Sequence, residues 1–292
     1  MHGSLVALPA ANIVGFNQGT RVFSDGVDLN RIMPGGRAGR GNLYAKSLFQ
    51  KVLSTGIDYC VDLHTASTGR VNSLYVRADM KNPVTAKMAM LQNTQFTLHA
   101  VAAFDGRADT LRNAMMAIDV PTVTLEIGDP SVFNRALIRE ALPGIFNLMD
   151  HLSMFGEGSH AMTTVDDDEN KLPNEARLCV KSVWMWTDHG GILKVVAEIG
   201  EKVHKGQRVA YIVDIFGVLV CNYYAPVSGY VIGKSVNPVV QAGDRIAHIG
   251  VEGTLDAFGL SVKALEDLDM LSEMEDDAVE EDETERQGNE CC

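Results

Sequence analysis

Residues 57–65, IDYCVDLHT, form an alternating apolar run that stops at a histidine and passes into the polar segment ASTG. This pattern predicts a β-strand that ends in a loop. Alternate side chains on a strand share a face, so Asp62 and His64 point the same way, toward the crevice found at the carboxyl ends of many strands. A carboxylate beside an imidazole orients a histidine that binds a metal or transfers a proton. The alternative is an ordinary polar pair whose members satisfy each other.

The composition is that of a soluble globular protein. Its 292 residues fit about two domains, with 46% hydrophobic and 22% charged residues. No apolar run approaches the roughly 18 to 20 residues needed to cross a bilayer, and the N-terminus lacks the basic start of a signal peptide. We therefore expect a cytoplasmic protein without a membrane partner. The five cysteines show no spacing typical of a disulfide framework or a thiolate zinc site.

Most of the negative charge lies at the C-terminal end. Residues 261–292 contain thirteen Asp or Glu residues against Lys263 and Arg286, a net charge of −11. The other residues therefore carry −13 − (−11) = −2, without a basic stripe that would bind nucleic acid. The acidic end is either an interaction segment or, more commonly for such tails, a solvated and disordered one.

The segment 1–160 alternates apolar strands with amphipathic helices, which predicts an α/β domain with a mixed sheet and flanking helices. We expect strands at residues 4–9, 57–64, 73–76, 96–104 and 120–128, and helices at residues 42–53, 83–93, 110–116 and 131–152. The intervening residues 12–41 are rich in glycine, arginine and asparagine. A loop of this length and composition is typical of a ligand-binding segment.

After a polar linker at residues 161–176, short β-type runs recur about every ten residues between residues 177 and 258. This spacing predicts a small all-β module, followed by the acidic tail at residues 259–292. The turns at residues 200–207, 225–229 and 241–244 resemble those of biotinyl/lipoyl-type β-sandwiches. The hairpin at residues 214–218, DIFGV, lacks the lysine that a carrier domain would modify, so a structural module or one that covers the active site is expected.

Three motifs occur in the order DLNRIMPG (residues 28–35), DLHT (62–65) and TLEIG (124–128). Together they resemble the succinylglutamate desuccinylase/aspartoacylase family, a branch of the zinc-carboxypeptidase-like hydrolases, over about residues 1–160. The resemblance implies a zinc-carboxypeptidase-like sheet and one zinc ion. It also implies a deacylase that cleaves the amide bond of an N-acyl amino acid or a similar small N-acylated amine. The sequence leaves open whether the chain forms a homo-oligomer.

The resemblance also assigns roles to single residues. His64 matches the third zinc ligand, and Glu126 matches the acid that takes a proton from the zinc-bound water and passes it to the leaving amine. Arg21 fits the arginine that supports the carbonyl oxygen. The substrate carboxylate is expected to contact Asn30, Arg31 and, by a looser match, Arg112.

Some of these residues have plainer interpretations. Arg21 is otherwise an ordinary loop arginine, Asn30 a turn residue and Glu126 a surface acid.

The two other zinc ligands of that family come from an H-G-x-E loop, and no H-x-x-E motif occurs in this chain. One histidine does not make the three-ligand site typical of catalytic zinc. The sequence is therefore expected to be N-terminally incomplete relative to the family. The favoured explanation is an enzyme whose first segment is missing from this sequence. The alternative is a catalytically inactive homologue that acts as a binding or assembly protein.

Overall fold

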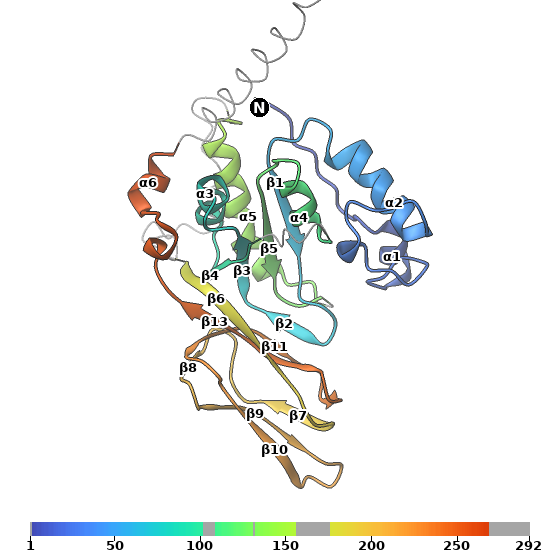
Figure 1. Cartoon of the computed structure of the whole chain (residues 1–292), viewed down its shortest axis with the longest axis vertical. Helices are drawn as coiled ribbons and strands as arrows, with labels where there is room; N and C mark the ends of the chain where they lie inside the picture. Colours follow the sequence, from blue (N-terminus) through green and yellow to red (C-terminus); the bar gives the residue numbers. More distant parts are fainter. Residues whose placement is uncertain (1, 102–108, 131, 156–175, 269–292) are drawn as a thin grey trace, which may run out of the picture.

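A computed structural model of the chain describes residues 2–101, 109–130, 132–155 and 176–268 (Figure 1). Its larger sheet has nine strands, of which β8 (Lys202–Val203) pairs only with β11. The other strands lie in the spatial order β1 (Cys60–His64), β5 (Thr122–Ile127), β3 (Leu74–Ala78), β4 (Phe96–His99), β6 (Arg177–Trp186), β13 (Arg245–Glu252), β11 (Gly229–Ser235) and β2 (Arg70–Asn72).

This sheet is mixed, as the sequence predicts. The pairs β1–β5, β3–β4 and β4–β6 are parallel, whereas β3–β5 and the pairs that involve β13 or β11 are antiparallel. A second sheet has the order β10 (Leu219–Tyr224), β9 (Arg208–Val213), β7 (Gly191–Val195) and β12 (Val239–Val240). The strands that follow residue 176 therefore continue the sheet of the N-terminal half and also build a separate small sheet below it (Figure 1).

The helices lie along the upper part of the molecule in Figure 1. Their bounds are α1 (Ile13–Gln18), α2 (Arg40–Leu48), α3 (Pro83–Leu91), α4 (Leu111–Met116), α5 (Arg135–His151) and α6 (Val262–Glu266). Short helical turns of other types occupy η1 (Leu29–Arg31), η2 (Phe49–Leu53) and η3 (Leu255–Phe258). Among the described residues, no helix is long and apolar enough to cross a membrane.

Local sequence explains where the main helices begin. The side chains of Asn82, Thr110 and Asn134 accept hydrogen bonds from the first turns of α3, α4 and α5. Such caps satisfy backbone N–H groups that have no partner inside a helix. Apolar residues of α3 and α5 pack with Leu74, Val76 and Leu125 of the sheet in one buried core, and α4 contributes to a second core cluster.

Most predicted elements are confirmed, with shifts of a few residues at their ends. The expected strand at residues 4–9 is wrong, because these residues form no strand. The expected loop at residues 12–41 contains α1 and η1. Residues 161–175 of the predicted linker lie outside the described residues. The acidic tail is described only to residue 268, where Leu265 of α6 packs into the core.

The loop that carries Asn30 and Arg31 is fixed against α2 at Gly35. This glycine has φ +94°, and a Cβ atom there would collide with the backbone nitrogen of Lys46 and the carbonyl oxygen of Asn42. A Cβ atom at Gly26, with φ +82°, would meet no atom within 4 Å. Position 35 therefore requires glycine both for its positive φ and for the lack of space for a Cβ atom, whereas position 26 requires it only for its positive φ.

We predict that Gly35→Ala lowers the free energy of unfolding by about 3 kcal/mol, because backbone strain and a collision add. Gly26→Ala is the matched control and should cost only the strain, about 1 kcal/mol. Urea denaturation of both variants measures the difference. Equal losses would contradict the described packing of this loop on α2.

Candidate functional site

The parallel pairing of β1 with β5 places two predicted site residues side by side. His64 is the register partner of Glu126, and Asp62 is the partner of Thr124. Side chains in register on neighbouring strands point to the same face of the sheet. The carboxyl ends of two parallel strands thus bring an imidazole and a carboxylate to one edge.

The side chain of His64 contacts Asp62, as the strand pattern predicts. Its Nε2 atom lies 2.8 Å from Oδ2 of Asp62 and 3.3 Å from Nδ2 of Asn30. Burial is the largest influence on the pKa of His64 and lowers it. The hydrogen bond and charge of Asp62, together with the charge of Glu126, outweigh burial and raise this pKa above its ordinary value.

Glu126 is buried, which excludes the interpretation as a surface acid. Its Oε2 accepts a hydrogen bond of 3.0 Å from Nδ2 of Asn72, and its Oε1 lies 3.3 Å from Nε of Arg77. Arg77 also donates to the hydroxyl of Tyr75. The contacts with Asn72 and Arg77 therefore hold this carboxylate in a buried environment.

Two other predicted site residues, Arg21 and Asn30, lie near His64 but already have partners of their own. Arg21 forms an ion pair with Asp28, with Nε 2.8 Å from Oδ2, and lines the same pocket as His64. The Oδ1 atom of Asn30 accepts a 2.7 Å hydrogen bond from the backbone N–H of Leu111. The amide oxygen of Asn30 therefore already has a backbone partner.

The two arginines predicted to contact the substrate carboxylate are instead bonded to backbone carbonyl groups. Arg31 is exposed and donates to the carbonyl of the preceding residue at 2.5 Å. Arg112 donates to the carbonyl of Ala100, and burial, followed by the charge of Arg77, lowers its pKa. As described, neither guanidinium makes a two-point contact of the kind expected for a substrate carboxylate.

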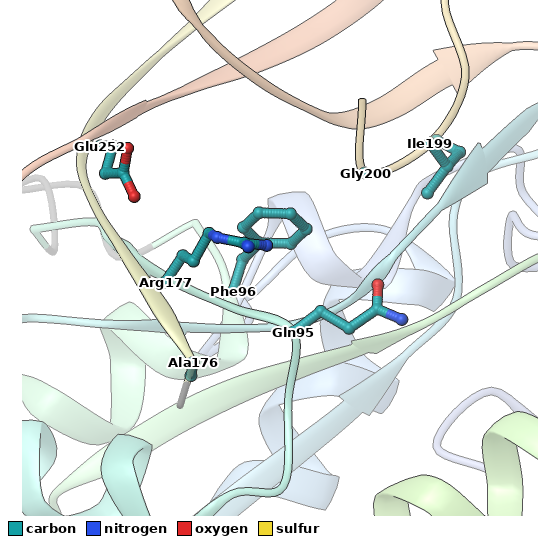
Figure 2. A pocket seen from close by; sticks show the side chains of 7 residues that line it. All are labelled: Gln95, Phe96, Ala176, Arg177, Ile199, Gly200 and Glu252. Atoms are coloured by element: carbon teal, nitrogen blue, oxygen red, sulfur yellow. The ribbon is translucent and has the colours of Figure 1, made fainter. Parts of the chain in front are cut away.

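A pocket of about 530 Å³ lies at the strand ends. Arg21, His64 and Asp129 give it polar groups, while Phe16, Phe133 and Ile138 contribute apolar walls. A small, mainly apolar cavity with few polar groups is typical of a site for a small molecule. A larger hollow of about 780 Å³ lies between Phe96, Arg177 and Glu252 (Figure 2) and contains none of the predicted site residues.

Positive groups that the sequence analysis did not single out reach the site from β2 and β13. Arg245 lies over the rings of Trp184 and Trp186, with Cζ at 4.5 and 4.9 Å from their centroids. Arg70 lies over Trp184 at 5.6 Å. Burial, followed by the charge of Arg245, lowers the pKa of Arg70, whose charge also acts on Arg21 and Glu126. The surroundings of Glu126 are therefore rich in arginine.

The histidine next to this group is uncharged. His248 stacks on Trp184 with a centroid distance of 4.3 Å. Burial and the charge of Arg77 lower the pKa of His248 to about 3. No sequence pattern indicates these contacts or that of Asn72, because they depend on the pairing of β6 with β13 and of β2 with β11, in which Asn72 is the partner of Gly233. Residues far apart in the chain become neighbours only through that pairing.

The residues at this site do not by themselves fit a catalytic zinc ion. Such an ion needs about three protein ligands. Within the described ranges, no third His, Cys, Asp or Glu joins His64 and Asp62 in a cluster with metal-ligand spacing. The Nε2 atom of His64 is also occupied by Asp62. We therefore assign no step to zinc here.

We predict that Asp62→Asn lowers the pKa of His64, because the hydrogen bond and negative charge that raise it are both weakened. An NMR titration of the His64 imidazole measures this shift. Because the pKa of His64 is higher in the folded protein than its value of 6.5 in the unfolded chain, the protonated imidazole stabilises the fold. This stabilisation is complete below pH 6.5 and is lost as the pH rises through the pKa of the folded protein. The variant should thus lose about 1 kcal/mol more near pH 6 than near pH 9.

Asp58→Asn is the control, since Asp58 is an exposed acid close in sequence. An unchanged His64 titration in Asp62→Asn, or an equal shift in Asp58→Asn, would show that the pair does not form.

Comparison with known proteins agrees with this geometry. Residues 1–152 match the family model described as the succinylglutamate desuccinylase/aspartoacylase catalytic domain. The N-alpha-acetyl-L-2,4-diaminobutyric acid deacetylase of Halomonas elongata is 24% identical over 85% of this chain and 72% of its own length.

Solved structures show the same fold. The product-bound ectoine utilization protein EutE (DoeB) from Ruegeria pomeroyi has a TM-score of 0.70 at 21% identity, and a succinylglutamate desuccinylase/aspartoacylase from Rhodobacter sphaeroides has a TM-score of 0.71 at 20% identity. Each comparison covers 84% of this chain and 74% of the other. The family model, which spans more than half of the chain, gives the assignment: this protein belongs to the succinylglutamate desuccinylase/aspartoacylase family of hydrolases.

Proposed function

We propose that this protein is a deacylase that hydrolyses the amide bond of a small N-acylated amine, with N-acyl amino acids as the expected substrates. The observation that carries the proposal is the register of β1 and β5, which sets His64 beside the buried carboxylate of Glu126 at the edge of a pocket. Membership of a family of hydrolases and the deacetylase name of the Halomonas relative support the reaction class.

In this proposal Glu126 is the general base that takes a proton from water and later gives it to the leaving amine. Arg77 and Asn72 hold the carboxylate in place. Arg21 stabilises the negative charge that develops on the carbonyl oxygen, since it lies on the pocket with His64. Of these groups, Arg21 lines the pocket, and Glu126 is in register with His64, which also lines it.

The substrate proposal includes a negatively charged group. Arg21 and Arg77 have carboxylate partners in Asp28 and Glu126. Within the described part of the chain, Arg70 and Arg245 contact aromatic rings and form no ion pair. Such a surplus of positive charge favours an anionic ligand. Asn30, Arg31 and Arg112 remain the proposed contacts to its carboxylate, after side-chain rearrangement.

Zinc dependence is an expectation from the family and carries no step of this proposal. When bound, zinc polarises a carbonyl and lowers the pKa of a water ligand. Of the residues described at this site, His64 is the proposed ligand, and the other ligands of a complete zinc site are not among them.

We also propose that residues 177–258 act as a biotinyl/lipoyl-like β-module that closes one side of the site. The boundaries proposed from sequence place the catalytic-type domain at residues 1–160, the linker at 161–176 and the acidic tail at 259–292. The pairing of β11 with β2, and the position of Arg245 near Arg77, support a role for the module beside the site.

A second candidate function is a binding protein without catalytic activity. The observation that favours it is the 2.8 Å contact between His64 Nε2 and Oδ2 of Asp62, which occupies the nitrogen that a zinc ion would need. Such a protein would hold a small anionic ligand in the same pocket and release it unchanged.

The test is the release of free amine from a panel of N-acetyl and N-succinyl amino acids that includes Nα-acetyl-L-2,4-diaminobutyrate, with and without added zinc. We predict turnover that falls by about 100-fold or more in Glu126→Gln, because the general base is lost. Asp150→Asn, an exposed acid on α5, is the control and should keep full activity.

Binding measured by calorimetry with the same panel separates the two candidate functions. Ligand binding without any amine release, in the presence of zinc, would favour the binding protein. Turnover that is unaffected by Glu126→Gln would contradict the proposed mechanism.

A further inference from the structure

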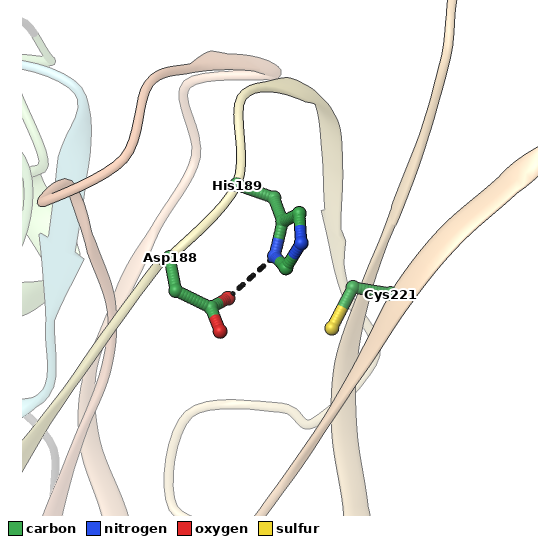
Figure 3. A group of neighbouring side chains, drawn as sticks. All are labelled: Asp188, His189 and Cys221. Atoms are coloured by element: carbon green, nitrogen blue, oxygen red, sulfur yellow. Dashed lines mark hydrogen bonds and ion pairs between the residues drawn. The ribbon is translucent and has the colours of Figure 1, made fainter.

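A second group of metal-ligating side chains lies outside the candidate functional site, among the strands that follow residue 176. It consists of Asp188 and His189, in the turn between β6 and β7, and Cys221 on β10 (Figure 3). One potential ligand atom from each side chain lies within 4.8 Å of the others. No other group of this kind occurs among the described residues.

The carboxylate and imidazole are fixed in orientation. The hydroxyl of Tyr223 donates to Oδ1 of Asp188 at 2.6 Å, and the backbone N–H of Asp188 donates back to that hydroxyl at 3.3 Å. The same Oδ1 lies 2.8 Å from Nδ1 of His189. Tyr223 and His189 together therefore orient this carboxylate toward the group.

Cys221 completes the set from a different strand. Its side chain lies beside Asp188 and His189 in Figure 3, and its thiol donates to the carbonyl of Asn222 at 3.5 Å. The register of β10 with β9 is irregular between Leu219 and Cys221. Such bulges turn a side chain away from the regular pleat. The other described cysteines are poorly suited as ligands, because burial raises the pKa of Cys60 to about 11 and that of Cys179 to about 12.

We propose that Asp188, His189 and Cys221 bind one divalent transition-metal ion, with zinc as the expected metal. Thiolate, imidazole and carboxylate are the three ligand types that zinc accepts, whereas magnesium and calcium avoid sulfur. In a tetrahedral zinc site the ligand atoms are about 3.3 to 3.8 Å apart, so a closure of about 1 Å brings this group to the required geometry.

Binding would replace the proton of the Cys221 thiol, which passes to solvent, and would displace the hydrogen bond between Asp188 and His189. The exposed side of the group leaves the fourth position to water. The ion would link the turn that joins the two sheets to β10, the edge strand of the smaller sheet. This site is independent of the proposed deacylase activity.

The cysteines show no spacing typical of a thiolate zinc site, because the members of this group are distant in sequence. His189 and Cys221 are widely separated in the chain, and β10 reaches the turn only because β9 connects it to β7 in the sheet. Motifs of closely spaced ligands do not detect a site of this kind.

The experiment is a titration of the metal-free full-length chain with Co²⁺, followed by absorbance in the near ultraviolet. Cobalt takes the same ligands as zinc and gives a charge-transfer band only when a thiolate binds it. We expect a one-to-one band that disappears in Cys221→Ser and a metal affinity that falls about tenfold or more in His189→Ala. Zinc should displace the cobalt and raise the Tm of the wild type but not that of Cys221→Ser.

Three controls locate the site. The band should persist in Cys60→Ser and in His64→Ala, and also in the double variant Cys291→Ser/Cys292→Ser, which removes the thiols at the C-terminal end. Far-ultraviolet circular dichroism checks that each variant is folded. A wild type without the band, a band that survives in Cys221→Ser, or a band lost in the double variant would overturn the proposal.

Discussion

The parallel pairing of β1 with β5 is the constraint on which the candidate site depends. It places His64, which lines the pocket, in register with Glu126, so two side chains from different strands lie on the same face of the sheet. Each is then oriented by a local partner, Asp62 for the imidazole and Arg77 for the carboxylate. A shift of one residue in this register would turn the two groups to opposite faces of the sheet and remove the site.

A second constraint is the short strand β2, which connects two parts of the molecule. It pairs with β11 from the C-terminal half, and the next residues enter β3 beside β5. Through this connection Asn72 reaches Glu126, and Arg70 lies over Trp184, on which Arg245 also lies because β13 pairs with β6. The strands after residue 176 therefore contribute charge to the site and do not merely follow the catalytic-type domain. The surplus of arginine gives a physical reason to expect an anionic substrate.

Sequence predicted what depends on local pattern. The strand that ends at His64, the helix that begins at Pro83 and the pairing of Asp62 with His64 follow from periodicity, a capping residue and the i, i+2 geometry of a strand. The strand expected at residues 4–9 is absent because an apolar run forms a strand only where another strand pairs with it. Asn72, Arg77 and Arg245 were missed because their neighbours come from distant segments. The engagement of Asn30 by Leu111 could not be predicted for the same reason.

The central claim is that His64 and Glu126 act on the same ligand. A crystal structure of the protein with a bound N-acetyl amino acid tests this most directly. We expect the amide to lie between these two side chains, with the carboxylate directed toward the arginines. A ligand in the hollow lined by Phe96 and Arg177, or one that contacts neither His64 nor Glu126, would contradict it.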